Sequence, residues 1–225
     1  MLGELLGLFK SPVTVFTKRS EERNIKKEGI ITAVIVLVIS LITILTTYLG
    51  VVKVLNKTYK SVKDYNNKYS YKEVTTTEFK ELKKEAKENL LENIKFTKIF
   101  FKTAGITLLT VVVVAGILFI ISRMVKSPKD YIEMVAMTNC AFEIYLIGFI
   151  LNAIFEYIYV PVGIILFISL IIFAIIALAN SFRENIEIED PNKLVIFSGI
   201  VLAIVVAILV LIANNYISNM FYGLL

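Results

Sequence analysis

Five long apolar stretches with almost no charge decide what this chain can fold into. A membrane span needs about 20 apolar residues, because the hydrocarbon core of a bilayer is about 30 Å thick. The stretches of this length carry a single Asp, Glu, Lys or Arg side chain between them, Glu143, and they cover residues 29–52, 103–122, 134–155, 157–182 and 194–225. The pattern predicts an all-α polytopic membrane protein.

Proline positions divide the chain independently of hydropathy. A proline suits the first position of a helix, where its fixed φ and missing N–H cost nothing. Three of the predicted helix starts have a capping side chain: Ser11-Pro12, Ser127-Pro128 with Asp130, and Asp190-Pro191. The fourth, Pro161, has none. We therefore predict a lead of residues 1–28 and a membrane domain of residues 29–225. Its five spans lie at about residues 29–52, 103–122, 131–155, 157–182 and 192–217.

Composition argues against most catalytic classes. The chain is 57% hydrophobic and has no His, no Trp and one Cys. Zinc sites of the His/Cys type, His-dependent triads and disulfide frameworks therefore cannot be built. The net charge of +5 comes from lysines that flank apolar runs, which favours anionic lipid headgroups over nucleic acid. We expect no enzyme activity, no cofactor, no metal and no nucleic-acid partner. The charged residues before residue 29 also argue against a cleavable signal, so the first span is expected to be retained.

The lead has two interpretations. Leu2, Leu5, Leu6 and Phe9 fall at helical spacing, as do Val13 and Phe16. Such short amphipathic helices lie on a membrane surface in many peripheral proteins. Alternatively, the same apolar residues pack under the bundle, and the sequence does not separate these two arrangements.

Residues 53–102 form the only large polar region, with thirteen Lys and seven acidic residues. Apolar side chains follow helical spacing on both sides of an expected turn at residues 66–74, and Thr75 with Glu78 resembles a capping box. We expect a helical hairpin that projects from spans one and two, with a contact stripe for its own second arm or for a protein partner. A solvated loop is the alternative. The stripe consists of Leu55, Tyr59, Val62, Phe79, Leu82, Leu90 and Ile94.

Short polar segments predict the orientation. With the N-terminus inside, eleven basic residues of the lead and of loops 123–130 and 183–193 lie in the cytoplasm. The long hairpin places its thirteen lysines outside, but long loops count little in this rule. We therefore expect a multi-pass protein of the cell membrane with a cytoplasmic N-terminus and an outside C-terminus.

Glu143 is the one acidic residue inside a predicted span, and Asn139 and Cys140 lie one helical turn before it. A lone carboxylate in lipid is costly, and no Lys or Arg lies mid-span to pair with it. We expect Glu143 to be protonated or to face a wet cavity. It then serves either as a proton- or cation-responsive site or as a hydrogen-bonding group between helices.

Several segments resemble the Yip family, the Ypt/Rab-GTPase-interacting membrane proteins, in its bacterial branch. The resemblance rests on the lead Leu8–Pro12 with Phe16, the start of span three at Tyr131–Ala136, the short turn into span four, and the exit Asn180–Arg183. It implies five spans, a cytosolic N-terminus and a C-terminus on the far side. The Asp-Leu-Tyr-Gly-Pro and Gly-Tyr segments of the eukaryotic branch are absent here, so the resemblance assigns no binding residues.

Together these observations favour a non-enzymatic integral membrane protein that acts through protein or lipid contacts in membrane organisation or trafficking-like processes. The partners expected are membrane lipids, a protein bound through the hairpin, and further copies of the chain. The alternative is a channel or transporter subunit with an ion-responsive Glu143.

Overall fold

The computed structural model describes residues 2–69, 76–124 and 129–186. These residues fold almost entirely into α-helices, which agrees with the all-α prediction. In chain order the helices are α1 (Leu2–Lys10), α2 (Pro12–Glu21), α3 (Ile25–Tyr69), α4 (Thr76–Asn93), α5 (Phe96–Met124), α6 (Tyr131–Ile158) and α7 (Val160–Ile186).

Four of these helices are long and apolar enough to cross a membrane. The candidate spans within the described residues are Ile25–Tyr65, Phe96–Met124, Tyr131–Phe155 and Val160–Glu184. They agree with the first four predicted spans. The first two are longer than predicted at both ends, the third has the predicted bounds, and the fourth is shifted by two to three residues toward the C-terminus. The predicted fifth span, residues 192–217, lies outside the described residues, as do Ser127-Pro128 and Asp190-Pro191.

Among the described residues, proline marks two helix starts as expected, but the two predicted caps described there, Ser11 and Asp130, do not form. Pro12 occupies the first turn of α2 and Pro161 is the second residue of α7. Neither Ser11 before α2 nor Asp130 before α6 donates or accepts a side-chain capping bond. Asp130 contacts Arg23 instead, so an ion pair replaces the predicted cap at this position.

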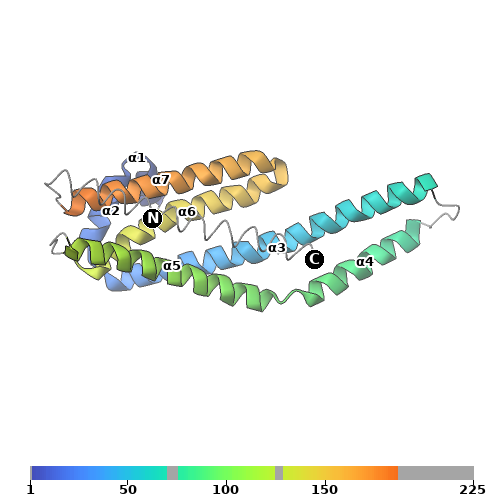
Figure 1. The fold of residues 1–225 in the computed structure, drawn as a ribbon, viewed down its shortest axis with the longest axis horizontal. Helices are drawn as coiled ribbons and strands as arrows, with labels where there is room; N and C mark the ends of the chain where they lie inside the picture. Colours follow the sequence, from blue (N-terminus) through green and yellow to red (C-terminus); the bar gives the residue numbers. More distant parts are fainter. Residues whose placement is uncertain (1, 70–75, 125–128, 187–225) are drawn as a thin grey trace. The chain divides into compact units, whose positions relative to one another are not determined.

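The described chain divides into two compact units, and the division falls within α3 and α5. The first unit holds the described residues of Met1–Thr32 and Thr110–Leu225, and the second holds Ala33–Leu109. In the first unit α6 and α7 lie side by side as an antiparallel pair, and α2 packs against both (Figure 1). Its core combines Leu8 and Phe16 of the lead with Ala115, Leu118, Ile121, Met134, Met137, Cys140, Ile144, Ala174, Ala177 and Phe182.

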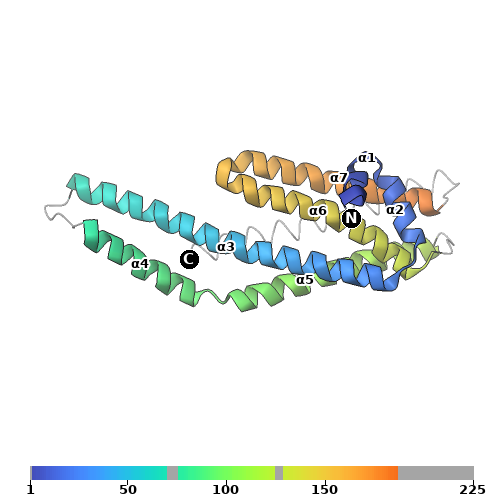
Figure 2. The same ribbon diagram turned by 180° about the vertical axis from the view of Figure 1, so that it is seen from behind.

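In the second unit the C-terminal part of α3 runs beside α4, as both ribbon views show (Figure 2). The Tyr59 hydroxyl donates a hydrogen bond to the Leu82 carbonyl at 2.8 Å. Two details differ from the sequence interpretation. The helix α3 continues through residues 66–69, where a turn was expected, and the chain breaks its helix at residues 94–95 although no proline or glycine lies there. The Asn93 side chain donates to the Asn89 carbonyl at the end of α4, and such local side-chain bonds compete with the helical ladder.

Polar side chains within the first apolar run bond to their own helix. In lipid every polar group needs a partner inside the protein, since no water is present. The Ser40 hydroxyl donates to the Val36 carbonyl at 2.7 Å, and the Thr43, Thr46 and Thr47 hydroxyls donate to carbonyls three or four residues earlier. The hydrogen-bonding capacity of these hydroxyls is therefore met within α3, and no functional role is needed to explain them.

Gly148 allows α6 and α7 to approach closely. A Cβ at this position would lie 3.1 Å from Leu170 Cβ on α7. Small residues at such crossings let helix backbones come together in membranes. We predict that Gly148→Val lowers the free energy of unfolding by about 1–3 kcal/mol, the usual cost of overpacking.

The matched control for this prediction is Gly105→Val. A Cβ at Gly105 meets no described heavy atom within 4 Å, so the change is expected to cost less than about 1 kcal/mol. Unfolding in mixed micelles with increasing SDS measures both. Equal losses for the two variants would contradict the close crossing.

A buried ion cluster as candidate functional site

The turn between α2 and α3 fixes the geometry of the site. Arg23 adopts φ 44°, a left-handed conformation that usually requires glycine after a helix. Its N–H donates to the Ser20 carbonyl at 3.3 Å, which closes the end of α2. Asn24 then caps α3, because its Oδ1 accepts from the Lys27 N–H at 3.0 Å. The turn therefore holds Arg19 and Glu28 on facing sides of two adjacent helices.

Arg19 and Glu28 form a buried bidentate ion pair. The Arg19 Nε lies 2.8 Å from Glu28 Oε1, and Nη2 lies 3.2 Å from Oε2. The two residues are only 7% and 3% exposed. Parallel N–H donors of a guanidinium match the two oxygens of a carboxylate, and this geometry makes charge-assisted pairs strong and directional.

The third span supplies a second carboxylate and an amide. Arg19 Nη1 lies 2.6 Å from Glu143 Oε1. The Asn139 Nδ2 donates to Glu28 Oε2 at 2.7 Å and lies 3.2 Å from the Glu28 carbonyl. The Thr32 hydroxyl lies 3.0 Å from Asn139 Oδ1 and 2.9 Å from the Glu28 carbonyl. We call Arg19, Glu28, Thr32, Asn139 and Glu143 the ion cluster.

A second group of charges lies around Glu133, near the start of α6. Glu133 is 1% exposed, and its Oε1 lies 2.7 Å from Arg23 Nε while its Oε2 lies 3.4 Å from Lys129 Nζ. These contacts pair the charges, although neither oxygen makes a well-directed hydrogen bond to the described residues. Arg23 also lies 3.3 Å from Asp130. The ion pair with Glu133 offsets the strain of the left-handed backbone at Arg23.

The charges of the cluster keep Arg19 protonated. Burial by itself would lower the pKa of Arg19, but the hydrogen bond to Glu28 and the surrounding negative charge outweigh burial and raise the pKa. The guanidinium contacts two carboxylates, so the cluster binds the lead to α6 by charge as well as by packing. Chemically, this arrangement can hold helices together and brings two carboxylates onto one guanidinium.

The structure gives Glu143 a cationic neighbour that the sequence did not indicate. No Lys or Arg lies mid-span, as the sequence shows, but Arg19 reaches Glu143 from α2 in the lead. Glu143 is 16% exposed and lies against the Arg19 guanidinium. Asn139 and Cys140 are both fully buried. Asn139 belongs to the ion cluster, while Cys140 packs in the hydrophobic core and also lies next to Arg19.

Sequence reasoning missed Arg19, Glu28 and Thr32. A signal for two of them exists, because Glu28 and Thr32 share one helical face in the same i, i+4 spacing as Asn139 and Glu143. Two polar pairs of this kind on two spans favour a contact between the spans. Nothing in the sequence distinguishes Arg19 from the other five basic residues of the lead.

The hairpin contact stripe is covered only in part. Leu55, Tyr59 and Ile94 are half-buried, whereas Val62, Leu82 and Leu90 are exposed at 45%, 53% and 45%. The side chain of Phe79 and the Thr75–Glu78 capping box lie outside the described side chains. No group of three His, Cys, Asp or Glu residues in the described part of the chain is placed to hold a metal ion.

Four long apolar helices, with a charged cluster that joins the lead to α3 and α6, define a polytopic α-helical membrane protein. The family model of the Yip1 domain matches residues 6–212, nearly the whole chain. The chain therefore belongs to the Yip1 domain family. Neither a curated protein nor a solved structure matches it.

Proposed function

We propose that this protein is a non-enzymatic member of the Yip family that acts through protein or lipid contacts in membrane organisation or trafficking-like processes. The observation that carries the proposal is the Yip1 domain match over residues 6–212. The ion cluster supports it, because Arg19, Glu28 and Asn139 direct their polar atoms at one another and tie helices together. Such a cluster is suited to fixing a scaffold.

The proposal includes the topology. Five crossings, with residues 192–217 as the last, leave the two termini on opposite sides of the membrane. In the proposed orientation the N-terminus is in the cytoplasm and the C-terminus is outside the cell. The basic residues of the lead and of the loops at 123–130 and 183–193 support this orientation. Assignment to the bacterial branch and to the cell membrane belongs to the same proposal, as does the projection of α3 and α4 from the membrane as a hairpin.

The exposed part of the hairpin contact stripe is the proposed protein-contact surface. Leu82 and Leu90 lie eight residues apart on α4, about two helical turns, and both are exposed. Apolar side chains at such spacing serve as anchors when a helix binds a partner. We expect a protein partner, or a second copy of the chain, to cover them.

Crosslinking in native membranes tests this surface. Cys140 is the only cysteine, so a Cys140→Ala chain with cysteines introduced at Leu82 or Leu90 gives site-specific crosslinks. We expect one recurrent adduct from these positions and none from matched cysteines at Lys80 or Lys84, which are exposed on another face of α4. The double change Leu82→Ser/Leu90→Ser should also abolish co-purification of that partner. A partner-free monomer that turns over a substrate would refute the proposal.

A channel or transporter subunit is the second candidate, and one observation favours it. Arg19 contacts two carboxylates, Glu28 and Glu143, so uptake of one proton would balance the charge of these three groups. A cluster of this kind can respond to pH or to a cation. Flux through proteoliposomes that changes with Glu143→Gln would support this function, and flux that is insensitive to the substitution would remove Glu143 from it.

A further inference from the structure

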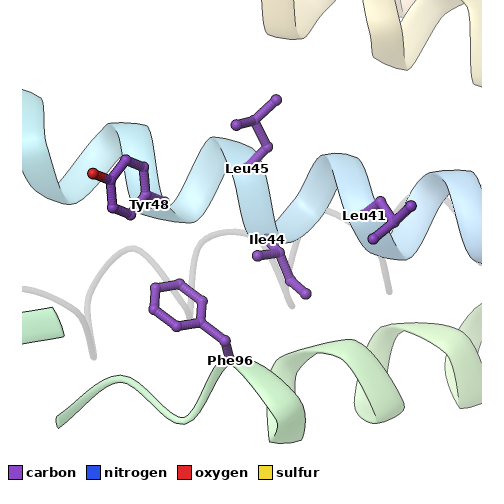
Figure 3. Close-up of a pocket in the computed structure, with 5 residues that line it drawn as sticks. All are labelled: Leu41, Ile44, Leu45, Tyr48 and Phe96. Atoms are coloured by element: carbon purple, nitrogen blue, oxygen red, sulfur yellow. The ribbon is translucent and has the colours of Figure 1, made fainter. Parts of the chain in front are cut away.

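An apolar groove lies between α3 and the start of α5, within the second unit. It is lined by Leu41, Ile44, Leu45 and Tyr48 of α3 and by Phe96, the first residue of α5, and its volume is about 280 Å³. Figure 3 shows the Phe96 ring rising from α5 toward α3, while Ile44 points from α3 toward α5. This volume lies near the lower limit of ligand pockets, about 300 Å³, so a slender ligand fits it better than a bulky one.

A lysine marks one end of the groove. The Lys87 Nζ lies 5.8 Å from the centroid of the Tyr48 ring, a distance typical of a cation held over an aromatic face. Lys87 comes from α4 and is half-buried. The Tyr48 end of the groove therefore presents a positive charge and a phenol, while the Leu41 end is apolar.

The groove has the position, and about two thirds of the length, of the hydrocarbon part of one leaflet. Tyr48 lies four residues before the end of the uncharged run 29–52, and Leu41 lies at the middle of that run. Seven helical residues separate them, about 10 Å. A leaflet's share of the hydrocarbon core is about 15 Å. The groove thus runs from the headgroup region, where tyrosine and lysine are favoured, toward the bilayer centre.

We propose that this groove binds an acyl chain of an anionic phospholipid, with the phosphate of the headgroup next to Lys87. The apolar lining accepts the chain, and the Lys87 cation at the Tyr48 end selects for negative charge. A protein helix, about 10 Å across, is too wide for a groove of this volume. The inference rests on the proposed lipid contacts and names their lipid class.

Fluorescence quenching by brominated lipids tests the site. The chain contains no tryptophan, so Phe96→Trp introduces a single reporter into the groove, and Tyr48→Trp is a second reporter should the first disturb folding. Each is reconstituted in vesicles that mix unlabelled phosphatidylcholine with dibrominated phosphatidylglycerol or dibrominated phosphatidylcholine. We expect the anionic lipid to bind at the groove about fivefold more tightly, the factor that corresponds to ~1 kcal/mol per lysine near a membrane surface. Ile165→Trp on α7, which is 63% exposed, should show no such preference.

Lys87→Gln should abolish the preference, while Lys80→Gln, an exposed lysine on the same helix, should leave it unchanged. Three results would overturn the proposal: no quenching of either groove reporter, equal quenching by both lipids, or the same loss with Lys80→Gln. The crosslinking at Leu82 and Leu90 does not depend on the groove. A failed lipid test with intact crosslinks therefore rejects the lipid site alone.

Discussion

Arg19→Met lowers the free energy of unfolding by about 3–5 kcal/mol, the cost of removing one partner from a buried ion pair. The substitution keeps the length and apolar stem of the side chain but leaves Glu28, 3% exposed, and Glu143 without their guanidinium. Each carboxylate then stays charged in a poorly solvated place or takes up a proton. Titration with SDS in mixed micelles, with helix content as the signal, measures the loss.

Lys18→Met is the matched control, because Lys18 is the exposed neighbour of Arg19 on α2. It should shift the unfolding transition by less than about 0.5 kcal/mol. Neutralising the carboxylates as well, in Arg19→Met/Glu28→Gln/Glu143→Gln, should restore most of the lost stability, because no buried charge remains unpaired. An Arg19→Met protein as stable as Lys18→Met would show that the cluster does not hold the lead to the bundle.

The helices were predictable wherever the signal is local. Nearly uncharged runs of about 20 residues mark α3, α5, α6 and α7, and the prolines at positions 12 and 161 mark the starts of α2 and α7. Hydrophobic length and proline geometry both act within one segment. The predicted caps at Ser11 and Asp130 were wrong for the opposite reason. A side-chain oxygen near a helix start has several competing partners, and Asp130 pairs with Arg23, which is distant in sequence.

The break between α4 and α5 was not predicted, since neither proline nor glycine marks it. Residues 93–96 leave the helix through short-range bonds. The Ile94 N–H donates to the Leu91 carbonyl, and the Phe96 N–H donates to the Ile94 carbonyl. Ile94, the last residue of the stripe, lies in the break and therefore does not continue the helical face of α4 that carries Leu82 and Leu90, which periodicity alone cannot reveal.

Only the α6 residues of the ion cluster could be predicted from the sequence. Intramembrane Glu143 and Asn139 stand out in an apolar run, so their importance follows from the cost of polar groups in lipid. Their partner Arg19 is 124 residues away from Glu143 in the chain. The turn at residues 22–24 decides which of the six basic residues of the lead reaches Glu143, because the left-handed Arg23 and the Asn24 cap set the direction of α2.

The lead packs against the bundle through Leu8 and Phe16, which favours the packing interpretation over the membrane-surface one.

Phe16→Ala is expected to lower the free energy of unfolding by about 3–5 kcal/mol, the range found for large aromatic residues removed from a close-packed core. Phe16 is 0% exposed on α2 and belongs to the same cluster as Met134, Met137 and Phe182. Its removal leaves a cavity where the lead, α6 and α7 meet. SDS titration gives the loss, and amide hydrogen exchange in α2 should become faster because the lead undocks before the bundle unfolds.

Leu6→Ala on α1 provides the comparison, since Leu6 is 57% exposed and should cost less than about 1 kcal/mol. The two interpretations of the lead predict opposite readouts. If the lead is part of the core, Phe16→Ala weakens the bundle and Leu6→Ala does not. If the lead lay on the membrane surface, Phe16→Ala would instead weaken the attachment of the lead to vesicles and leave the unfolding of the bundle unchanged. That second outcome would also remove the basis for Arg19 reaching Glu143, because the ion pair requires α2 to stay packed against α6.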